Sequence, residues 1–322
     1  MKAFQVLLYY QFVAIDDHEQ FAADHLELCR SLGLLGRILV APEGINGTVS
    51  GSAEACQGYM DALHADPRFA DMPFKIDEVD GHVFQKLFVR ARPEIIALGG
   101  DVNMDRRGGY LKPAEFLKAM EEPGVILLDG RNNYESEMGH FEGALCPDVR
   151  NFREFREWIL EHLSSHRGDR ILTYCTGGIR CEKLTAWMVQ EGFEDVWQLD
   201  GGIVTYGYDP EAKGAKFDGS CYVFDDRVGV PINRSGGAKV LTKCYHCGVE
   251  SEHFVNCANV ECNLLHAVCP DCEAKMGCCC SEKCMDSPFR RIGPGRLAKK
   301  SELPARRSAG RRLSALRGSA GV

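Results

Sequence analysis

The chain has 322 residues, of which 45% are hydrophobic and 26% charged, so it is long enough for two or three domains and can bury a substantial core. It contains no apolar run of about eighteen residues, which excludes a membrane-spanning helix, and its first residues lack the pattern of a signal peptide. We therefore expect a cytoplasmic protein that has no membrane partner.

Charge and cysteine are distributed unevenly along the chain. The formal net charge is −8, yet residues 290–322 contain ten Lys and Arg and one acidic residue, Glu302. Such a basic tail is either a solvated, disordered extension or a surface for an acidic partner such as nucleic acid. Ten of the sixteen cysteines lie between Cys244 and Cys284. Without an export signal, this clustering indicates metal binding or thiol chemistry rather than disulfide bonds.

The segment 1–92 is predicted to form a small α+β domain. Its expected strands are 4–13, 37–41, 48–50, 74–79 and 83–91, with a turn at 42–47. One expected helix is capped by Asp16 or Asp17 and ends near Leu32, and the other begins at Ser52 and ends near His64. This order of elements is typical of a ferredoxin-like, two-layer fold of the acylphosphatase type.

The segment 122–218 is predicted to be a doubly wound α/β domain, joined to the first by a polar, glycine-containing connector at 93–121. Its expected strands are 125–129, 170–174 and 195–199, and its expected helices are 151–163 and 181–191. Strands that alternate with helices favour a parallel sheet, and the apolar run at 125–129 is typical of a strand buried on both faces. A cysteine-rich region at 219–289 and the basic tail at 290–322 follow.

Cys175 directly follows the strand predicted at 170–174, at the sheet edge where open α/β folds place their ligands. The loop after it consists of Thr176, Gly177, Gly178 and Ile179. Its two glycines allow the backbone to curl so that several N–H groups point inward and form a binding loop. The following helix and Arg180 add positive charge, so the pKa of Cys175 should be low. We predict that Cys175 is a nucleophile and that Arg180 is its catalytic partner; a buried structural cysteine is the alternative.

The four residues between Cys175 and Arg180 make a shorter loop than that of the cysteine phosphatases. A loop of this size suits a persulfide or another small group. Cys181 lies six residues after Cys175, in the first turn of the predicted helix. It can resolve an oxidised Cys175 as a disulfide, or it can be a packed helix residue.

The stretch 174–183, Tyr-Cys-Thr-Gly-Gly-Ile-Arg-Cys-Glu-Lys, resembles the active-site loop of rhodanese domains. Other rhodanese-like elements are Leu-Leu-Asp-Gly-Arg at 127–131, Glu135 with Gly-His-Phe-Glu-Gly-Ala at 139–144, and Leu-Asp-Gly-Gly-Ile at 199–203. Among rhodaneses, the loop is most similar to that of the tRNA uridine hydroxylase family. Segments 36–48, 86–90 and 278–284 also resemble that family, so the resemblance extends over about residues 4–290.

The resemblance implies an oxidoreductase that uses molecular oxygen to convert the wobble uridine of tRNA to 5-hydroxyuridine, with Cys175 as its reactive residue. The loop alone supports a second function, a sulfurtransferase that carries sulfane sulfur as a persulfide on Cys175. A non-catalytic binding module is a third, which the intact Cys175 and Arg180 disfavour. The sequence shows neither a flavin-binding glycine fingerprint between a strand and a helix nor a recognisable set of two histidines and one carboxylate for iron.

Two Cys-x-x-Cys pairs in the cysteine-rich region are separated by twenty-one residues. They are Cys244 with Cys247 and Cys269 with Cys272. Four thiolates at this spacing resemble a structural zinc site, in which the metal substitutes for a small core. Redox-active or packed cysteines are alternatives, and His246, His253 or His266 can replace a ligand.

Two further features concern substrate binding. Lys86, Arg90 and Arg92 are expected on one face of a strand, where they can track tRNA phosphates or form a solvated sheet face. The turn at 43–47 can expose backbone donors to substrate, although its glycines are equally explained by tight geometry.

Overall fold

The computed structural model describes residues 2–291, so the predicted basic tail lies outside the described residues from residue 292 on. The chain divides into two compact units. The first contains the residues up to 217 together with 221–238, and the second contains 218–220 and the residues from 239 onward. Within residues 2–291, no helix is long and apolar enough to cross a membrane.

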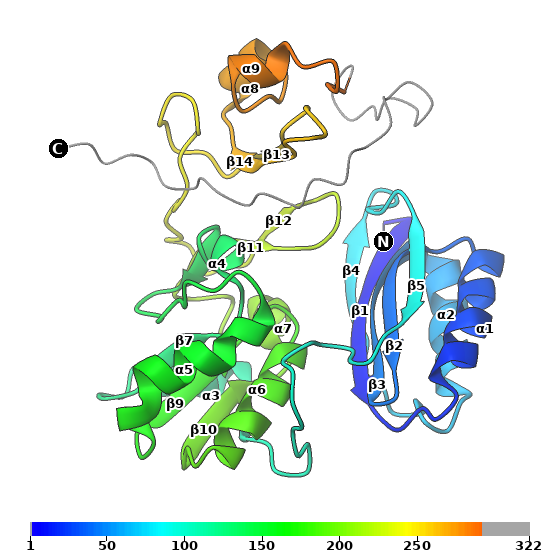
Figure 1. The fold of residues 1–322 in the computed structure, drawn as a ribbon, viewed down its shortest axis with the longest axis vertical. Coiled ribbons are helices and arrows are strands. Elements are labelled where there is room, and N and C mark those ends of the chain that lie inside the picture. The colour runs from blue at the N-terminus through cyan, green and yellow to red at the C-terminus, as the bar shows by residue number, and fades with distance from the viewer. Residues whose placement is uncertain (1, 292–322) are drawn as a thin grey trace. The chain divides into compact units, whose positions relative to one another are not determined.

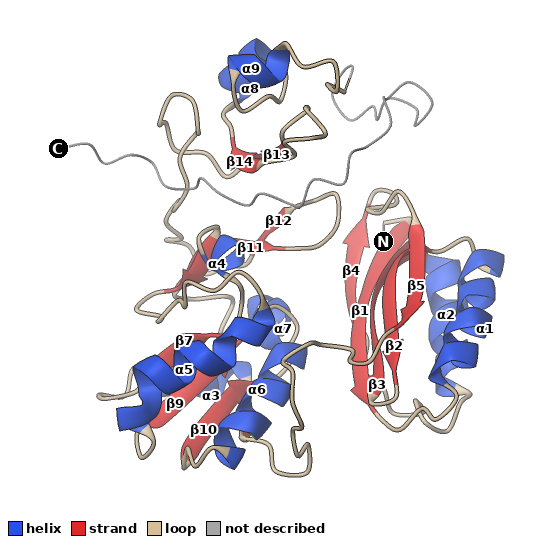
Figure 2. Cartoon of the chain, in the orientation of Figure 1, coloured by secondary structure: helices blue, strands red, loops and turns tan. Residues whose placement is uncertain are grey.

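The first unit begins with a five-stranded sheet that has two helices on one face (Figures 1 and 2). The strands are β1 (Phe4–Phe12), β2 (Leu35–Ala41), β3 (Gly44–Ser52), β4 (Lys75–Val79) and β5 (Leu87–Ala91), and the helices are α1 (His18–Ser31) and α2 (Ala53–His64). The order is β4-β1-β3-β2-β5, with β5 parallel to β2 and the other pairs antiparallel. This confirms the ferredoxin-like, two-layer architecture, to which β5 adds an edge strand.

Alternation along β1 explains why the helices cover one face only. Leu7 and Tyr9 are fully buried in the core beneath the helices. Leu8 and Tyr10 belong to the opposite face, because successive side chains of a strand point to opposite sides. The sheet therefore has one face packed on helices and one face free for other contacts.

The hairpin between β2 and β3 is tighter than the predicted turn at 42–47. Ala41 pairs with Gly44, so the turn contains only Pro42 and Glu43, and the glycine-rich stretch after it is already strand. Gly44 has a φ of +146°, and a Cβ there would collide with the carbonyl oxygen of Gln11 on β1. Here glycine is required by close strand packing rather than by a longer turn.

The predicted helix starts differ in their caps. The Ser52 hydroxyl accepts a hydrogen bond from the Ala55 N–H at 3.1 Å and caps α2 as expected. Asp17 occupies the corresponding position before α1, but its side chain makes no capping hydrogen bond. The prediction of an aspartate cap for α1 was therefore wrong.

A four-stranded parallel sheet follows in the first unit. Its strands, in the order β6-β10-β9-β7, are β6 (Gly109–Leu111), β10 (Asp195–Leu199), β9 (Arg170–Tyr174) and β7 (Ile126–Asp129). Its helices are α3 (Pro113–Ala119), α4 (Asn133–Ser136), α5 (Phe155–Leu163), α6 (Ile179–Gln190) and α7 (Gly202–Tyr208). On β9, Ile171 packs in the core formed with α5 and α6, and Leu172 packs in the core formed with α3 and α7. Helices on both faces confirm the doubly wound architecture.

Two elements, β6 and α3, lie inside the stretch expected to be a connector at 93–121. The sequence signal for β6 is weak because the strand has only three residues. Its first residue is Gly109, and another glycine, Gly108, precedes it. A Cβ at Gly108 would approach the Val196 carbonyl oxygen, and one at Gly109 would collide with the Trp197 ring. The small residues permit close contact with β10 but hide the strand from a hydrophobicity pattern. The proposed domain limits of 1–92, 122–218 and 219–289 stay predictions.

The remaining elements are short. They are β8 (Gly139–Phe141), β11 (Phe217–Tyr222), β12 (Gly229–Pro231), β13 (Phe254–Asn256), β14 (Leu265–Ala267), α8 (Pro270–Met276) and α9 (Glu282–Met285). In the second unit, β13 and β14 form an antiparallel hairpin. The buried clusters of this unit consist mostly of cysteines, with few aliphatic side chains. An ordinary hydrophobic core therefore contributes little to its stability.

Candidate active site and metal centres

Cys175 lies between β9 and α6, at the carboxyl end of the parallel strand, and only 1% of it is exposed. The loop after it turns at Gly178, which has a φ of +104°. This conformation, which favours glycine, directs the Gly178 N–H to the Cys175 sulfur at 3.2 Å. The loop thus points a backbone donor at the sulfur, as an anion-binding loop does.

The surroundings of Cys175 favour its ionised form. Burial alone would raise the pKa of the thiol. Hydrogen bonds from the Cys181 side chain and from the backbone N–H groups of Gly178 and Cys181, together with the Arg180 charge, outweigh burial and lower the pKa to about 5. The lowered pKa favours the thiolate, which is the nucleophilic form of cysteine.

Arg180 is held by a carboxylate that is distant in the sequence. Its guanidinium donates to both oxygens of Glu135, at 2.6 and 2.8 Å, and more weakly to the Thr176 hydroxyl at 3.4 Å. Both charged groups are buried. The bidentate pair fixes the guanidinium near the loop, where its charge still lowers the pKa of Cys175. Sequence analysis named Glu135 only through a family resemblance, and nothing local in the sequence links it to Arg180.

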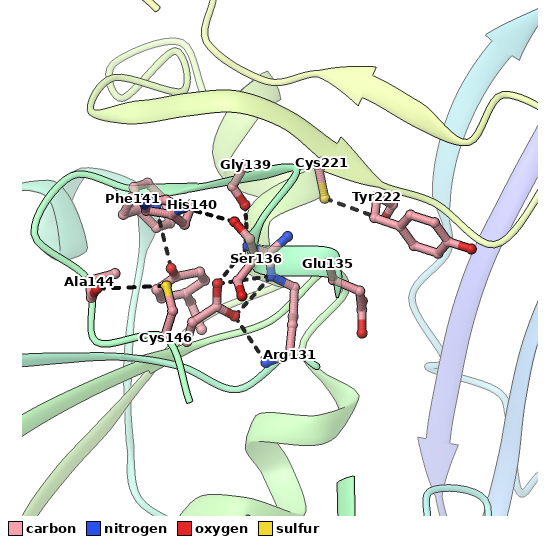
Figure 3. Close-up of polar contacts among 12 residues, drawn as sticks. Arg131, Glu135, Ser136, Gly139, His140, Phe141, Ala144, Cys146, Cys221 and Tyr222 are labelled. Atoms are coloured by element: carbon pink, nitrogen blue, oxygen red, sulfur yellow. Dashed lines mark hydrogen bonds and ion pairs between the residues drawn. The ribbon is translucent and has the colours of Figure 1, made fainter. Parts of the chain in front are cut away.

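A second buried ion pair supports the segment that carries Glu135 (Figure 3). Arg131 donates to Asp129 through Nε at 2.9 Å and Nη2 at 2.6 Å, and Nη2 also donates to the Gly139 carbonyl at 2.6 Å. Both side chains are fully buried. The pair therefore ties the end of β7 to the start of β8, on either side of the short helix α4 that contains Glu135.

Cys181 is buried in the first turn of α6, and its side chain is one of the groups that lower the pKa of Cys175. Burial, a side-chain hydrogen bond with Cys175 and the charge of Cys175 raise the pKa of Cys181 well above its ordinary value. The two neighbouring thiols thus have pKa values shifted in opposite directions, and ionisation of Cys175 is favoured over that of Cys181.

Strand β1 lies directly on the Cys175 loop. A Cβ at Gly177 would meet the Leu8 side chain at 2.9 Å, and one at Gly178 would meet the Tyr10 hydroxyl at 2.8 Å. The Lys75 ammonium donates to the Gly177 carbonyl at 2.9 Å. Both loop glycines are therefore needed for close packing, and Gly178 is needed for the loop conformation as well. This cover explains the low exposure of Cys175.

Glu43, in the turn that was considered for substrate binding, contacts helix α6 instead. Its carboxylate accepts hydrogen bonds from the Lys183 ammonium at 2.9 and 3.0 Å and from the Ile95 N–H at 2.8 Å. Lys183 is buried and also donates to Glu94 at 2.7 Å. The turn thus helps to hold the ferredoxin-like sheet against the helix that follows Cys175.

A cavity of about 440 Å³ lies beside β1 and the start of α7. Its lining includes Tyr10, Phe12, Lys75, Arg107, Glu182 and Asp200. Glu182 accepts hydrogen bonds from Tyr10 at 3.1 Å and Tyr110 at 2.7 Å and pairs with Arg107 at 3.3 Å. Sequence analysis did not find this cavity, because its walls come from segments far apart in the chain.

Comparison with known proteins adds the family. Models of three domains match the chain, described as the UPF0176 acylphosphatase like domain at residues 4–95, the rhodanese-like domain at 112–207 and the rhodanase C-terminal domain at 218–285. The tRNA uridine(34) hydroxylase of Bacillus velezensis is 53% identical over 286 residues, which are 88% of each chain. That of Bacillus pumilus is 52% identical over 289 residues, 89% of each, and that of Bacillus cereus is 50% identical over 293 residues, 90% of this chain and 92% of the relative.

The chain belongs to the tRNA uridine(34) hydroxylase family. The resemblance inferred from the cysteine loop and the flanking motifs is thereby confirmed. The family match extends through the cysteine-rich region, because the third domain model ends at residue 285.

In this member of the family, the four cysteines predicted to bind zinc lie together. The sulfurs of Cys244, Cys247, Cys269 and Cys272 are all within 4.8 Å of one another. Zn–S bonds of about 2.3 Å in a tetrahedron place the sulfurs about 3.8 Å apart, and Cys247 and Cys269 are separated by 3.7 Å. The residues present therefore fit a single four-thiolate ion.

The three histidines considered as replacement ligands are not members of this group. His253 pairs with Glu273 at 2.9 Å. His246 and His266 pack against each other and against Tyr245.

Four other cysteines, Cys257, Cys262, Cys280 and Cys284, form a second group with sulfurs within 4.8 Å of one another. Sequence analysis did not pair them, because their spacings of four and three residues differ from the Cys-x-x-Cys pattern. Their alternation with the first group along the chain is the signal that could have found them.

Proposed function

We propose that this chain hydroxylates uridine 34 of tRNA to 5-hydroxyuridine with molecular oxygen as co-substrate, and that Cys175 is the reactive residue. The observation that carries the proposal is a buried cysteine whose sulfur accepts a hydrogen bond from its own binding loop, in a chain about half identical to tRNA uridine(34) hydroxylases over most of its length. Because the substrate is tRNA, we place the protein in the cytoplasm.

The proposed chemistry starts from the Cys175 thiolate. A thiolate can take up sulfane sulfur as a persulfide or be oxidised to a sulfenate, and a thiol does either slowly. Loop residues 176–179 stabilise the anion, and Arg180 supplies the nearby positive charge while Glu135 fixes its position. The Cys181 side chain helps to lower the pKa of Cys175, and in this proposal it is also the resolving partner when Cys175 is oxidised.

The cavity beside β1 is the proposed site of the uridine. Its volume of about 440 Å³ is within the range of small-molecule sites, and it combines the aromatic rings of Tyr10 and Phe12 with the cations of Lys75 and Arg107. Unpaired bases of RNA loops are bound by stacking on aromatic rings and by hydrogen bonds to their edges. Cys175 does not line the cavity, and so the proposal requires the β1 cover to move when tRNA binds.

The face of the ferredoxin-like sheet opposite its helices is the proposed path of the tRNA backbone, beyond the part that packs on the Cys175 loop. Strand register places Leu8, Thr48, Arg37 and Phe88 in one row across the sheet. Tyr10, Asn46, Leu39 and Arg90 form the next row. Each row therefore runs from the strand that covers the Cys175 loop to a cationic edge.

The two rows end at strand β5, three strand spacings or about 14 Å from β1. Arg90 on β5 and Arg37 on the neighbouring β2 are exposed, and Lys86 and Arg92 flank β5, with Phe88 beside Arg90. In this proposal, Arg37 joins the cationic stripe of Lys86, Arg90 and Arg92 that was considered from the sequence. Cations interleaved with an exposed ring suit a single-stranded RNA segment.

We also propose that Cys244, Cys247, Cys269 and Cys272 hold a structural zinc ion. An ion bound by four thiolates has no open position for substrate, so it would stabilise the second unit rather than react. The residues of this unit would in that case contribute to folding and to the shape of the surface.

Deletion and complementation test the proposal. We expect tRNA nucleosides of a deletion strain to lack 5-hydroxyuridine and its derivatives by mass spectrometry. The wild-type gene and a Cys146→Ser control should restore them, and Cys175→Ser should not. Unchanged wobble nucleosides in the deletion strain would contradict the hydroxylase. A persulfide on Cys175 in purified protein, combined with unchanged nucleosides, would favour the sulfurtransferase.

A further inference from the structure

We propose that the second unit binds two zinc ions, and that Cys257, Cys262, Cys280 and Cys284 hold the second one. The ligand pairs of this site alternate along the chain with those of the first site. The inference goes beyond the proposed reaction, since neither group of four cysteines takes part in the chemistry at Cys175.

The sulfur positions of the second group fit one tetrahedral ion. All four lie within 4.8 Å of one another, with Cys262 and Cys280 at 3.6 Å and Cys280 and Cys284 at 3.7 Å. The separation expected for a tetrahedral zinc ion is about 3.8 Å. In a four-cysteine iron–sulfur cluster, several iron and sulfide ions stand between the thiolates and hold them farther apart. The compact group therefore favours a single ion.

Two of these sulfurs accept hydrogen bonds from neighbouring groups. The Cys280 backbone N–H points to the Cys257 sulfur at 3.5 Å, and the Asn259 side-chain amide donates to the Cys284 sulfur at 3.5 Å. Donors of this kind stabilise the negative charge of metal-bound thiolates and orient them.

The small core of the second unit is a second, independent reason to expect a metal ion at these cysteines. Cys257 is fully buried and Cys284 nearly so, and their cluster contains mainly other cysteines. The surrounding elements are a hairpin of three-residue strands and two helices of seven and four residues. Elements this short bury too little apolar surface to be stable alone, whereas metal binding supplies folding free energy directly.

The order of the pairs determines how the two sites depend on each other. Pairs 244/247 and 269/272 hold the first ion, and pairs 257/262 and 280/284 hold the second. The chain between the two ligand pairs of the first site therefore contains pair 257/262 of the second site. Likewise, the chain between the two pairs of the second site contains pair 269/272 of the first site. Loss of either ion should loosen the other, as expected for two interlocked loops rather than two separate fingers.

Metal analysis of the full-length protein tests the proposal, and Cys278→Ser is the matched control. Cys278 is adjacent to the second group but donates to the Glu273 carboxylate at 3.3 Å and belongs to neither set. We expect two zinc ions per chain in the wild type and in Cys278→Ser. The double variant Cys262→Ser, Cys284→Ser should retain one ion or fewer. One zinc or none in the wild type, or two in the double variant, would overturn the proposal.

Cobalt substitution tests the site in the wild-type protein, so the result does not depend on whether a variant folds. Cobalt(II) is added stepwise to metal-free wild-type protein under reducing conditions. The absorption of tetrahedral cobalt thiolate should rise until two equivalents are bound. Saturation at one equivalent, or an absorption typical of six-coordinate cobalt, would contradict the second site.

Discussion

Cys175 has a backbone donor, a buried arginine and one neighbouring cysteine, Cys181, around it, whereas between Cys244 and Cys284 sulfurs face other sulfurs in groups of four. In the first unit, an ordinary hydrophobic core holds the loop, so the cysteine is free for chemistry. In the second unit, the cysteines themselves occupy the core. The comparison shows that buried cysteines of one chain have different partners, so burial alone does not indicate what a cysteine does.

The largest effect should come from removing the reactive sulfur. Cys175→Ser should lower the rate of tRNA hydroxylation by at least about a thousandfold, because the hydroxyl does not ionise near neutral pH. The free energy of unfolding should change little. Hydroxylation is measured on purified tRNA by mass spectrometry. Activity within tenfold of wild type would mean that Cys175 resembles the structural cysteines of the second unit.

The next effect concerns the carboxylate that holds Arg180. Glu135→Gln leaves a buried guanidinium without a counter-charge and should lower the free energy of unfolding by about 3–5 kcal/mol. Glu137→Gln, an exposed neighbour, should change it by less than about 0.5 kcal/mol. Urea denaturation of both variants makes the comparison. Equal stabilities would show that the ion pair does not support the loop.

The pKa of Cys175 is the property that should differ most from that of an ordinary thiol. The ultraviolet absorbance of the thiolate, taken as the difference between wild type and Cys175→Ser, should titrate with a pKa of about 5. Because the pKa is lowered, the thiolate should persist as pH falls from 8 to about 6 and be lost below that. Cys181→Ala removes a donor and should move the pKa toward the ordinary value of 9. An unchanged midpoint would show that Cys181 is a packing residue only.

The smallest effect should be on tRNA affinity. Arg37→Ala and Arg90→Ala together should weaken binding about three- to tenfold and reduce the salt dependence by about one phosphate contact each. Arg30→Ala on helix α1 is the control, because α1 covers the opposite face of the sheet. Binding is measured by fluorescence anisotropy at several salt concentrations. An equal loss of tRNA affinity in the Arg30→Ala control would contradict binding of tRNA at this sheet face.

Sequence alone could predict the features that depend on neighbours along the chain. The Cys175 loop, the strand before it and the helix after it are contiguous, and the apolar run at 125–129 indicates a buried strand without further context. Pairings between distant segments could not be predicted. Glu135 reaches Arg180 across 45 positions, and Lys183 reaches Glu43 across 140. The second group of four cysteines likewise emerges only when the chain folds back on itself.

Oxygen labelling of the product tests the central claim most directly. Purified protein, a thiol reductant and a tRNA with uridine at position 34 are incubated under ¹⁸O₂, and the nucleosides are analysed by mass spectrometry. The account predicts 5-hydroxyuridine that carries one ¹⁸O atom, formed by wild type and absent with Cys175→Ser. Unlabelled product, or labelled product from the Cys175→Ser variant, would contradict it.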